Sequence, residues 1–269
     1  MVEASSTFAA FDGDRYELQM GRWSRRLAPL FISFSGIVAA DRVLDVGCGT
    51  GSLSFELSKN PRIAAVHGID LASVYIEHAT RSSRVKRVTF CVGDACTLPF
   101  SDAVFDHSLS SLVLQFIPDP DRAVREMLRV TRSGGTVAAT TWDTRGGMVI
   151  HRMFFDTASV LDPTAAAWRA RTCARLVSRT NGLAKLWRDA GLTDVIQDSI
   201  AIRMEYPSFD DFWNSVDGKD GPYAEYLGTL GSEMRSRLRA LIHAAYLDGD
   251  PDGLRSYVAI AWAVKGKVP

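Results

Sequence analysis

The chain has 269 residues, of which 46% are hydrophobic and 23% charged, with 31 basic and 31 acidic side chains. This length and hydrophobic content can bury a large core, as one α/β domain with insertions or as two domains. The balanced charge, without blocks of one sign, argues against nucleic acid or an anionic membrane as a partner. No 18 contiguous residues are apolar, and residues 1–14 lack the pattern of a secretion signal, so we expect a soluble, cytoplasmic protein without membrane insertion.

The cysteines and histidines give no sign of a metal site. Cys48, Cys91, Cys96 and Cys173 form no CxxC pair and no ligand-spaced cluster with the five histidines. We therefore expect buried, unreactive thiols, with neither a disulfide nor a bound metal.

The first predicted element in chain order is a helix around residues 16–27. Tyr16, Met20, Trp23 and Leu27 are spaced along one face of it. Such a stripe either packs against a core or closes over a ligand, and the residues alone leave both interpretations open.

The most informative segment is the run Val43-Leu44-Asp45-Val46-Gly47-Cys48-Gly49-Thr50-Gly51. Its branched apolar residues predict a strand over 42–46 that is buried on both faces of a parallel sheet. Gly47, Gly49 and Gly51 remove Cβ atoms from alternate positions, so a ligand can approach the main chain closely. A short helix over 52–57 follows, which completes a strand, a glycine loop and a helix.

The carboxylates around this loop indicate the ligand. A dinucleotide fingerprint counted from Gly47 would need its third small residue at position 52, but the glycines follow a Gly-x-Gly-x-Gly spacing. Asp45 would repel a pyrophosphate and would suit an ammonium group. Asp70, about 20 residues beyond the glycines, follows a predicted strand over 64–69, where such folds place a ribose-hydroxyl acceptor. Asp70 could instead cap a helix that begins near Ser73.

The remaining elements predict a doubly wound α/β sheet. Asp119-Pro120 begins a helix that we expect to end at Ser133-Gly134-Gly135. Another helix over 183–190 ends at Gly191. The other strands are predicted at 87–92, 104–110, 136–142, 195–204 and 257–264, the last after a turn at 249–253.

Four segments in the right order carry a family resemblance. Val43 to Gly51 and Ile69-Asp70-Leu71 are joined by Gly93-Asp94-Ala95, with its continuation to Asp106, and by Ser110 to Phe116. Together they resemble the class I S-adenosylmethionine-dependent methyltransferases, in the branch typified by ubiquinone and menaquinone biosynthesis C-methyltransferases. The resemblance is close over residues 15–145. It implies a Rossmann-like, seven-stranded, mostly parallel sheet with an antiparallel edge hairpin and helical cap insertions, and S-adenosylmethionine as cofactor.

The resemblance also implies site residues. Asp94 and Ala95 would lie along the adenine, and Ser111 beside the methionine part of the cofactor, although Asp94 could also be a turn residue. The helix of Tyr16 and Trp23 would close over the cofactor, with Arg22 or Arg25 as candidates to bind its carboxylate. The predicted cofactor-binding residues are Asp45, Gly47, Gly49, Gly51, Asp70, Leu71, Asp94, Ala95, Ser111, Tyr16 and Trp23.

We expect a single methyltransferase domain over residues 1–269. Its parts are lid helices over 1–40, a cofactor-binding core over 41–145, cap insertions over 145–180 and 206–250, and C-terminal sheet elements over 181–205 and 254–269. The insertions are rich in aromatic residues, which either pack as core or form an apolar wall for a flat acceptor. These aromatic residues are Phe154, Phe155, Trp168, Phe209, Phe212, Trp213, Tyr223, Tyr226 and Tyr246.

The predicted function is methyl transfer by in-line displacement to a small-molecule acceptor, through an oxygen, nitrogen or carbon nucleophile. Positioning can supply much of the rate, so no catalytic residue is assigned. Gln115, Asp143, His151 and Tyr206 are unranked candidates on the substrate side, whereas His107 is interpreted as a core residue. A nicotinamide-dinucleotide oxidoreductase and a noncatalytic S-adenosylmethionine-binding module are the alternatives, and the oligomeric state stays open.

Overall fold

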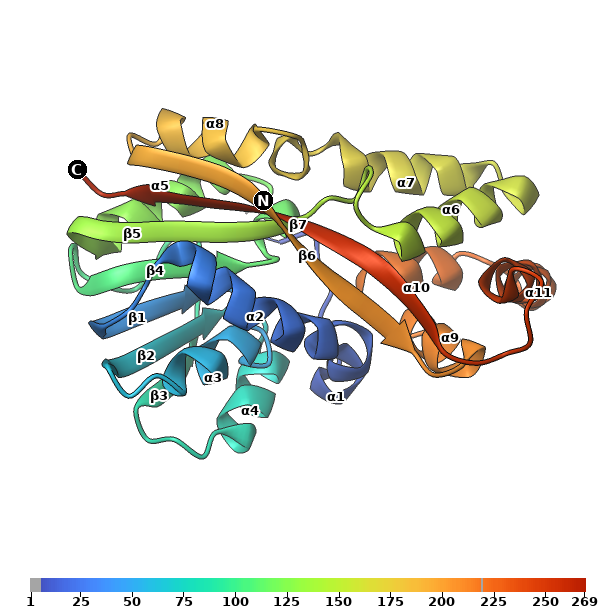
Figure 1. Ribbon diagram of the computed structural model, residues 1–269, viewed down its shortest axis with the longest axis horizontal. Coiled ribbons are helices and arrows are strands. Elements are labelled where there is room, and N and C mark those ends of the chain that lie inside the picture. Colours follow the sequence, from blue (N-terminus) through green and yellow to red (C-terminus); the bar gives the residue numbers. More distant parts are fainter. Residues whose placement is uncertain (1–5, 219) are drawn as a thin grey trace.

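The computed structural model describes residues 6–218 and 220–269, and its centre is a seven-stranded sheet (Figure 1). The strands are β1 (Ala40–Val46), β2 (Ile63–Asp70), β3 (Val88–Val92), β4 (Phe105–Ser111), β5 (Thr131–Trp142), β6 (Thr193–Tyr206) and β7 (Arg255–Lys267). Their order is β3-β2-β1-β4-β5-β7-β6. β1 to β5 pair in parallel, and β7 pairs antiparallel with β5 and β6, which confirms the predicted α/β sheet with an antiparallel edge pair.

Helices cover both faces of this sheet. They are α1 (Gly13–Tyr16), α2 (Arg22–Ser35), α3 (Ser52–Ser58), α4 (Ser73–Ser82), α5 (Pro120–Val130), α6 (Val149–Leu161), α7 (Thr164–Ala174), α8 (Gly182–Asp189), α9 (Phe209–Val216), α10 (Gly221–Gly228) and α11 (Ser232–Leu247). A π-helical turn, η1 (Glu17–Gly21), joins α1 to α2, and 3-10 turns lie at η2 (Leu114–Phe116) and η3 (Leu176–Ser178). Val43 packs with α2 and α3, whereas Leu44 packs with α5 and α8, so β1 is buried on both faces as predicted.

Helix α5 begins as predicted and ends earlier. The Asp119 carboxylate accepts a hydrogen bond from the Arg122 N–H at 3.0 Å, and Pro120 occupies the first turn. The helix ends at Val130, because the next residue, Thr131, already adopts an extended backbone and begins β5. The predicted stop at Ser133-Gly134-Gly135 is therefore wrong, since the sheet takes up the chain before the glycines are reached.

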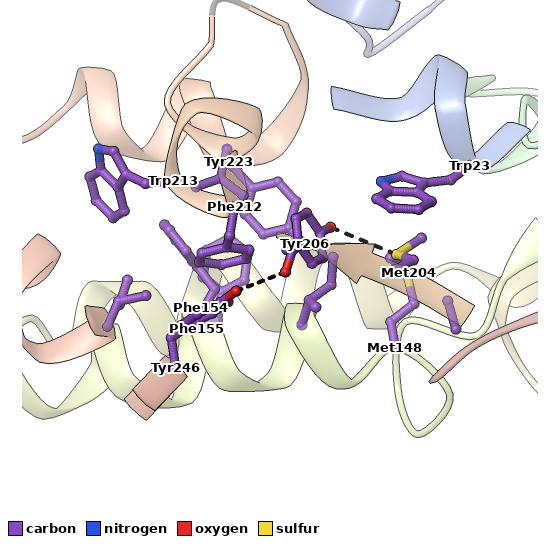
Figure 2. Packing of buried hydrophobic residues seen from close by; sticks show 14 of the residues in the cluster. Trp23, Met148, Phe154, Phe155, Met204, Tyr206, Phe212, Trp213, Tyr223 and Tyr246 are labelled. Atoms are coloured by element: carbon purple, nitrogen blue, oxygen red, sulfur yellow. Dashed lines mark hydrogen bonds between the residues drawn. The ribbon is translucent and has the colours of Figure 1, made fainter. Parts of the chain in front are cut away.

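The helices α6, α7 and α9 to α11 gather at the end of the sheet where β6 and β7 extend beyond the parallel strands (Figure 1). Their aromatic side chains form one buried cluster (Figure 2). Phe212 stacks on Tyr246, and the Tyr246 hydroxyl donates to the Tyr206 carbonyl at 3.1 Å. Phe155 stacks on Tyr223 in the same cluster. Most aromatic residues of the two insertions thus pack against one another as core.

Within residues 6–218 and 220–269, none of the helices has the length and apolar character needed to cross a membrane.

Candidate active site

The glycine run forms the turn between β1 and α3. Gly47 has a φ of 72°, and its N–H donates to the Ile69 carbonyl at 2.7 Å. A Cβ at this position would lie 2.4 Å from a γ-carbon of Val113, so only glycine fits. Gly49 also has a positive φ, and a Cβ there would meet the Tyr16 ring at 3.7 Å, an ordinary contact distance. No side chain of the described residues therefore covers the Gly49 main chain on the side that faces Tyr16.

Asp45 is the penultimate residue of β1, next to this turn, and is fully buried. One carboxylate oxygen, Oδ2, accepts a hydrogen bond from the Ser54 hydroxyl at 2.6 Å. The other, Oδ1, is buried without a partner among the described residues. Burial, and to a smaller extent the neighbouring Asp70, raises the pKa of this carboxyl to about 7, although the Ser54 hydrogen bond lowers it. A cation beside Oδ1 would offset the free-energy cost of ionising this buried carboxyl.

Asp70 lies at the end of β2, next to the same turn. Its Oδ2 accepts the Gly49 N–H at 2.8 Å and its Oδ1 accepts the Ala72 N–H at 2.9 Å. Burial raises the pKa of Asp70, while these backbone N–H groups lower it. Asp70 does not cap α4, whose N-cap residue is Ala72. Each Asp70 oxygen keeps a second lone pair for a ligand hydroxyl.

A cavity of about 300 Å³, here called the loop cavity, lies against these groups. A small space of about 20 Å³ beside Asp45 shares Tyr16, Gly47 and Ser111 with it. Predicted residues that line the loop cavity are Tyr16, Gly47, Gly49, Asp70, Leu71, Asp94, Ala95 and Ser111.

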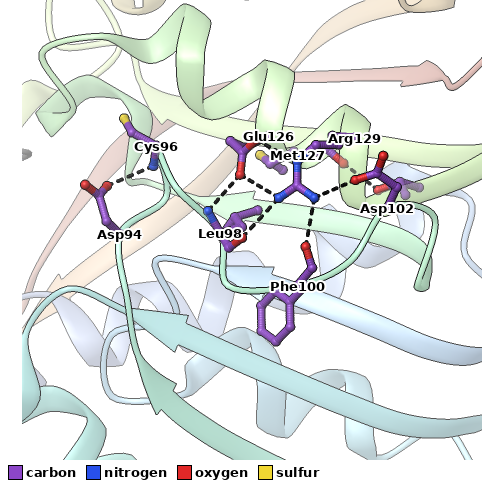
Figure 3. A network of polar contacts seen from close by, with 9 residues as sticks. Asp94, Cys96, Leu98, Phe100, Asp102, Glu126, Met127 and Arg129 are labelled. Atoms are coloured by element: carbon purple, nitrogen blue, oxygen red, sulfur yellow. Dashed lines mark hydrogen bonds and ion pairs between the residues drawn. The ribbon is translucent and has the colours of Figure 1, made fainter.

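Ion pairs fix the chain that follows Asp94 (Figure 3). Asp94 accepts the Cys96 N–H at 2.8 Å. Arg129 of α5 donates to the Leu98 and Phe100 carbonyls, at 3.0 and 2.8 Å, and pairs with Glu126 at 2.7 Å. Glu126 in turn accepts the Leu98 N–H at 2.8 Å, and the Arg129 hydrogen bond holds the pKa of Glu126 below its usual value. The segment bearing Asp94 and Ala95 is thereby attached to α5.

A second cavity, of about 170 Å³, is here called the aromatic cavity. It lies between the N-terminal segment, the end of β5 and helices α6, α7 and α10. Trp168 and Tyr223 line it, so these two aromatic residues of the insertions face a cavity while others pack as core. The residues that line both cavities are Phe8, Tyr16, Leu112 and Phe116.

Two of the four substrate-side candidates line the aromatic cavity, namely Gln115 and His151. His151 is buried, with Nε2 at 3.0 Å from the Thr172 hydroxyl and Nδ1 at 3.1 Å from the Tyr223 hydroxyl. Because the Thr172 hydroxyl donates to the Arg169 carbonyl, it accepts from Nε2, and Tyr223 then donates to Nδ1. Burial lowers the pKa of His151 to about 4, so the ring is neutral.

Comparison with known proteins decides the family. The family described as "Methyltransferase domain" matches residues 44–139. A ubiquinone/menaquinone biosynthesis C-methyltransferase of Bdellovibrio bacteriovorus is 33% identical, over 49% of this chain and 57% of that protein. A demethylmenaquinone methyltransferase of Roseiflexus castenholzii is 31% identical, over 57% of this chain and 68% of that protein. The chain belongs to the class I S-adenosylmethionine-dependent methyltransferases.

The fold of this methyltransferase is shared more widely than its sequence. A structure of phosphoethanolamine N-methyltransferase 2 of Haemonchus contortus with S-adenosyl-L-methionine superimposes with a TM-score of 0.58 at 18% identity, over 96% of this chain and 57% of that one. The methyltransferase spans a little over half the length of the Bdellovibrio relative.

Two predicted contacts of the methyltransferase lie elsewhere. Trp23 is buried in the aromatic core beside Tyr206, outside the linings of all three cavities. The π-helical turn at 17–21 explains this, because its wider winding rotates the face that bears Trp23 away from the face that bears Tyr16. Arg22 pairs with Asp211 at 2.8 Å instead of facing a cavity.

Other side chains also depart from the expectations for this methyltransferase. Gly51 has a φ of 94°, and a Cβ there would lie 2.8 Å from the Phe55 ring, so its role is in packing the start of α3. Arg25 forms an ion pair with Glu17. Asp143 and Tyr206 lie outside the lining of the aromatic cavity.

Sequence reasoning missed several residues of the methyltransferase site. Phe8 lines both cavities because the N-terminal segment attaches to the η2 turn, where the Thr7 N–H donates to the Phe116 carbonyl at 2.8 Å. The two residues are 109 positions apart, and no local pattern links them. Tyr75 of α4, which lines the loop cavity, follows the Asp70 motif by five residues and could have been found by extending that motif.

Proposed function

We propose that this methyltransferase binds S-adenosylmethionine in the loop cavity and transfers its methyl group to a small molecule held in the aromatic cavity. The observation that carries the proposal is the wall shared by the two cavities, formed by Phe8, Tyr16, Leu112 and Phe116. An in-line displacement needs the nucleophile about 3 to 3.5 Å from the methyl carbon, so donor and acceptor spaces must adjoin.

The residues of the loop cavity fit the cofactor. The free lone pairs of Asp70 suit ribose hydroxyls, and the unpartnered Asp45 oxygen, beside the small adjoining space, suits the ammonium group. Asp94 and Ala95 would lie along the adenine, and Ser111 beside the methionine part, as the family resemblance implies. When bound, S-adenosylmethionine supplies a methyl group that its sulfonium makes electrophilic.

Around the reacting groups the chain contributes positioning and exclusion of water. The shared wall is mainly aromatic and aliphatic, so closure of the N-terminal segment over it would remove solvent from the path of the methyl group. His151 is a poor general base near neutral pH, because its pKa is about 4 and both ring nitrogens have hydrogen-bond partners. Its role is to hold Tyr223 and Thr172 in place.

The nucleophile of the acceptor is open between oxygen, nitrogen and carbon. By their names, the Bdellovibrio relative is a C-methyltransferase and the Haemonchus protein of similar fold is an N-methyltransferase. The test is a calorimetric titration with S-adenosylhomocysteine, followed by a screen of hydroxylated aromatics, quinone precursors, amines and small acids with S-adenosylmethionine. Mass spectrometry should find S-adenosylhomocysteine and a product heavier by one methylene.

A matched pair of variants locates the acceptor. Thr144 lines the aromatic cavity, and its neighbour Arg145 is exposed and outside it. Thr144→Phe should abolish turnover and preserve S-adenosylhomocysteine binding, while Arg145→Phe should leave both unchanged. Tight cofactor binding without turnover of any acceptor would favour the noncatalytic module, and absence of cofactor binding would refute the proposal.

A further inference from the structure

Three polar atoms of the aromatic cavity's lining residues are buried without a hydrogen-bond partner among the residues that the structure describes. They are Oε1 of Gln115, Nε1 of Trp142 and Oγ of Ser178, and the three side chains are 8%, 4% and 2% exposed. A buried polar atom left unpaired costs about 1–3 kcal/mol, and a ligand that pairs with it would remove that cost. Their occurrence together in one cavity indicates a ligand with matching polar groups.

Gln115 marks where the ligand carries a hydrogen-bond donor. Its amide nitrogen donates to the Leu112 carbonyl at 2.8 Å, which fixes the amide so that Oε1 is the unpaired acceptor. Leu112 and Phe116, on either side of Gln115, both belong to the wall shared with the loop cavity. An O–H or N–H bound by Gln115 would therefore lie near the transferred methyl group.

Trp142 and Ser178 belong to a second part of the lining, where the side chains are hydrogen-bond donors. The Ser178 N–H bonds the Arg175 carbonyl at 3.1 Å, so the Ser178 hydroxyl and the Arg175 guanidinium belong to one turn. The Thr141 hydroxyl donates to the Val177 carbonyl at 2.7 Å and brings the end of β5, with Trp142, against this turn. Residues that carry an indole N–H, a hydroxyl and a guanidinium therefore lie on neighbouring backbone segments of the lining.

The charge of the lining favours an anion. Arg171 and Arg175 both line the cavity, and among the described residues neither has a carboxylate within 4.0 Å. Arg175 hydrogen-bonds only to the Ile117 carbonyl and the Thr7 hydroxyl, at 3.1 Å each, and Arg171 stacks on the Trp168 ring at 4.4 Å. Glu225 contributes one opposing carboxylate, which leaves a net positive lining.

The volume accommodates a ligand of one ring. A cavity of about 150 Å³ holds benzene, and this one measures about 170 Å³. We propose that the acceptor is a one-ring hydroxy- or amino-carboxylic acid, whose O–H or N–H donates to Gln115 and whose carboxylate is bound by Trp142, Ser178 and Arg175. This inference rests on the proposed function, because it names the acceptor of the same site.

The test is a calorimetric titration of the full chain saturated with S-adenosylhomocysteine. The probes are the three hydroxybenzoate isomers and 4-aminobenzoate, against phenol, which lacks the carboxylate, and benzoate, which lacks the donor. At least one of the four bifunctional probes should bind about tenfold or more tightly than either control, as one additional satisfied hydrogen-bonding group would give.

Variants assign the two ends of the probe. Arg175→Met should reduce the affinity for the preferred probe to that for phenol. Gln115→Leu should reduce it to that for benzoate. Arg171→Met tests the charge at an exposed position, and Glu225→Gln should tighten binding of the acid. Arg179→Met, an exposed residue outside the lining, is the control. S-adenosylhomocysteine affinity reports whether each variant is folded.

The outcomes separate the two proposals. Wild-type protein that binds S-adenosylhomocysteine, with no preference for any bifunctional probe over phenol, overturns the acceptor class and leaves the methyltransferase proposal standing. A preference that persists unchanged in both Arg175→Met and Arg171→Met also overturns it. Failure of the wild type to bind S-adenosylhomocysteine overturns both.

Discussion

The substitution Asp45→Asn should raise the stability of the free protein above neutral pH while weakening cofactor binding. The buried carboxyl has a pKa of about 7 in the folded protein, against an ordinary value of 3.8. At 1.36 kcal/mol per pKa unit, this difference amounts to about 4 kcal/mol. The sign follows from proton binding. The folded form keeps its proton to higher pH, so the contribution is fully present below pH 3.8 and is lost as the pH rises through 7.

An asparagine cannot ionise, so the variant should not lose this contribution. Denaturant unfolding without ligand should show Asp45→Asn more stable than the wild type at pH 8, by up to about 4 kcal/mol, and the difference should shrink towards pH 4. Asp41→Asn, at an exposed position of the same strand, should change neither value. Equal stability of Asp45→Asn and the wild type at pH 8 would refute the account of a charge buried without a partner.

The same variant tests the cofactor assignment. Loss of an ion-paired hydrogen bond to the ammonium group should weaken S-adenosylmethionine binding by about 1.5–3 kcal/mol in a titration at pH 8. Wild-type affinity should also fall as the pH drops below 7, where Asp45 takes up a proton, and the affinity of the variant should lack this dependence. Unchanged affinity would show that Asp45 does not contact the ammonium group.

Three further substitutions check the geometry of the site. Gly47→Ala should destabilise the protein by at least about 2 kcal/mol more than Gly134→Ala, because both positions have a φ near 72° but only the first would place a Cβ against a valine. Arg129→Met should lower both the unfolding midpoint and cofactor affinity, since it frees the Asp94 segment from α5, whereas Arg125→Met, exposed on the same helix, should lower neither. Trp23→Ala should cost about 3–5 kcal/mol of stability in denaturant unfolding and leave the cofactor affinity of the folded molecules unchanged, because the residue is core. A large loss of affinity in titrations of this last variant would restore Trp23 as a cofactor contact.

The parts of the fold and site that follow from sequence are those with a local cause. The strand, turn and helix around Gly47 could be predicted because buried apolar residues and a glycine at a close approach are both visible in a few neighbouring positions. The start of α5 is likewise local, since Asp119 and Pro120 sit within one turn of it. The end of α5 was not predictable in this way, because it depends on pairing of Thr131 with Phe105 of β4.

The N-terminal helix shows a second limit. A period of 3.6 residues puts Tyr16, Met20 and Trp23 on one face, and five π-helical residues break that period. Tyr16 and Met20 consequently line the aromatic cavity while Trp23 enters the core. No residue type marks a π-helical turn of this kind. The sequence could therefore indicate an apolar face on the helix, but not which of its residues line a cavity and which pack in the core.

The two cavities differ in how the chain builds them, and this difference explains why the donor could be inferred from sequence and the acceptor could not. The glycines and carboxylates of the loop cavity lie at the ends of adjacent parallel strands, where neighbours in the sheet are set by topology. The aromatic cavity is lined by side chains that come from many separate elements, namely the N-terminal segment, η2, β5, α6, α7, η3 and α10. Leu112 connects the two, with a φ of 63° that turns the chain out of β4 and aims its carbonyl at the Gln115 amide. That bond leaves the Gln115 oxygen without a partner among the described residues, so under the proposed function the strained backbone at the end of β4 would also influence which acceptor binds in the aromatic cavity.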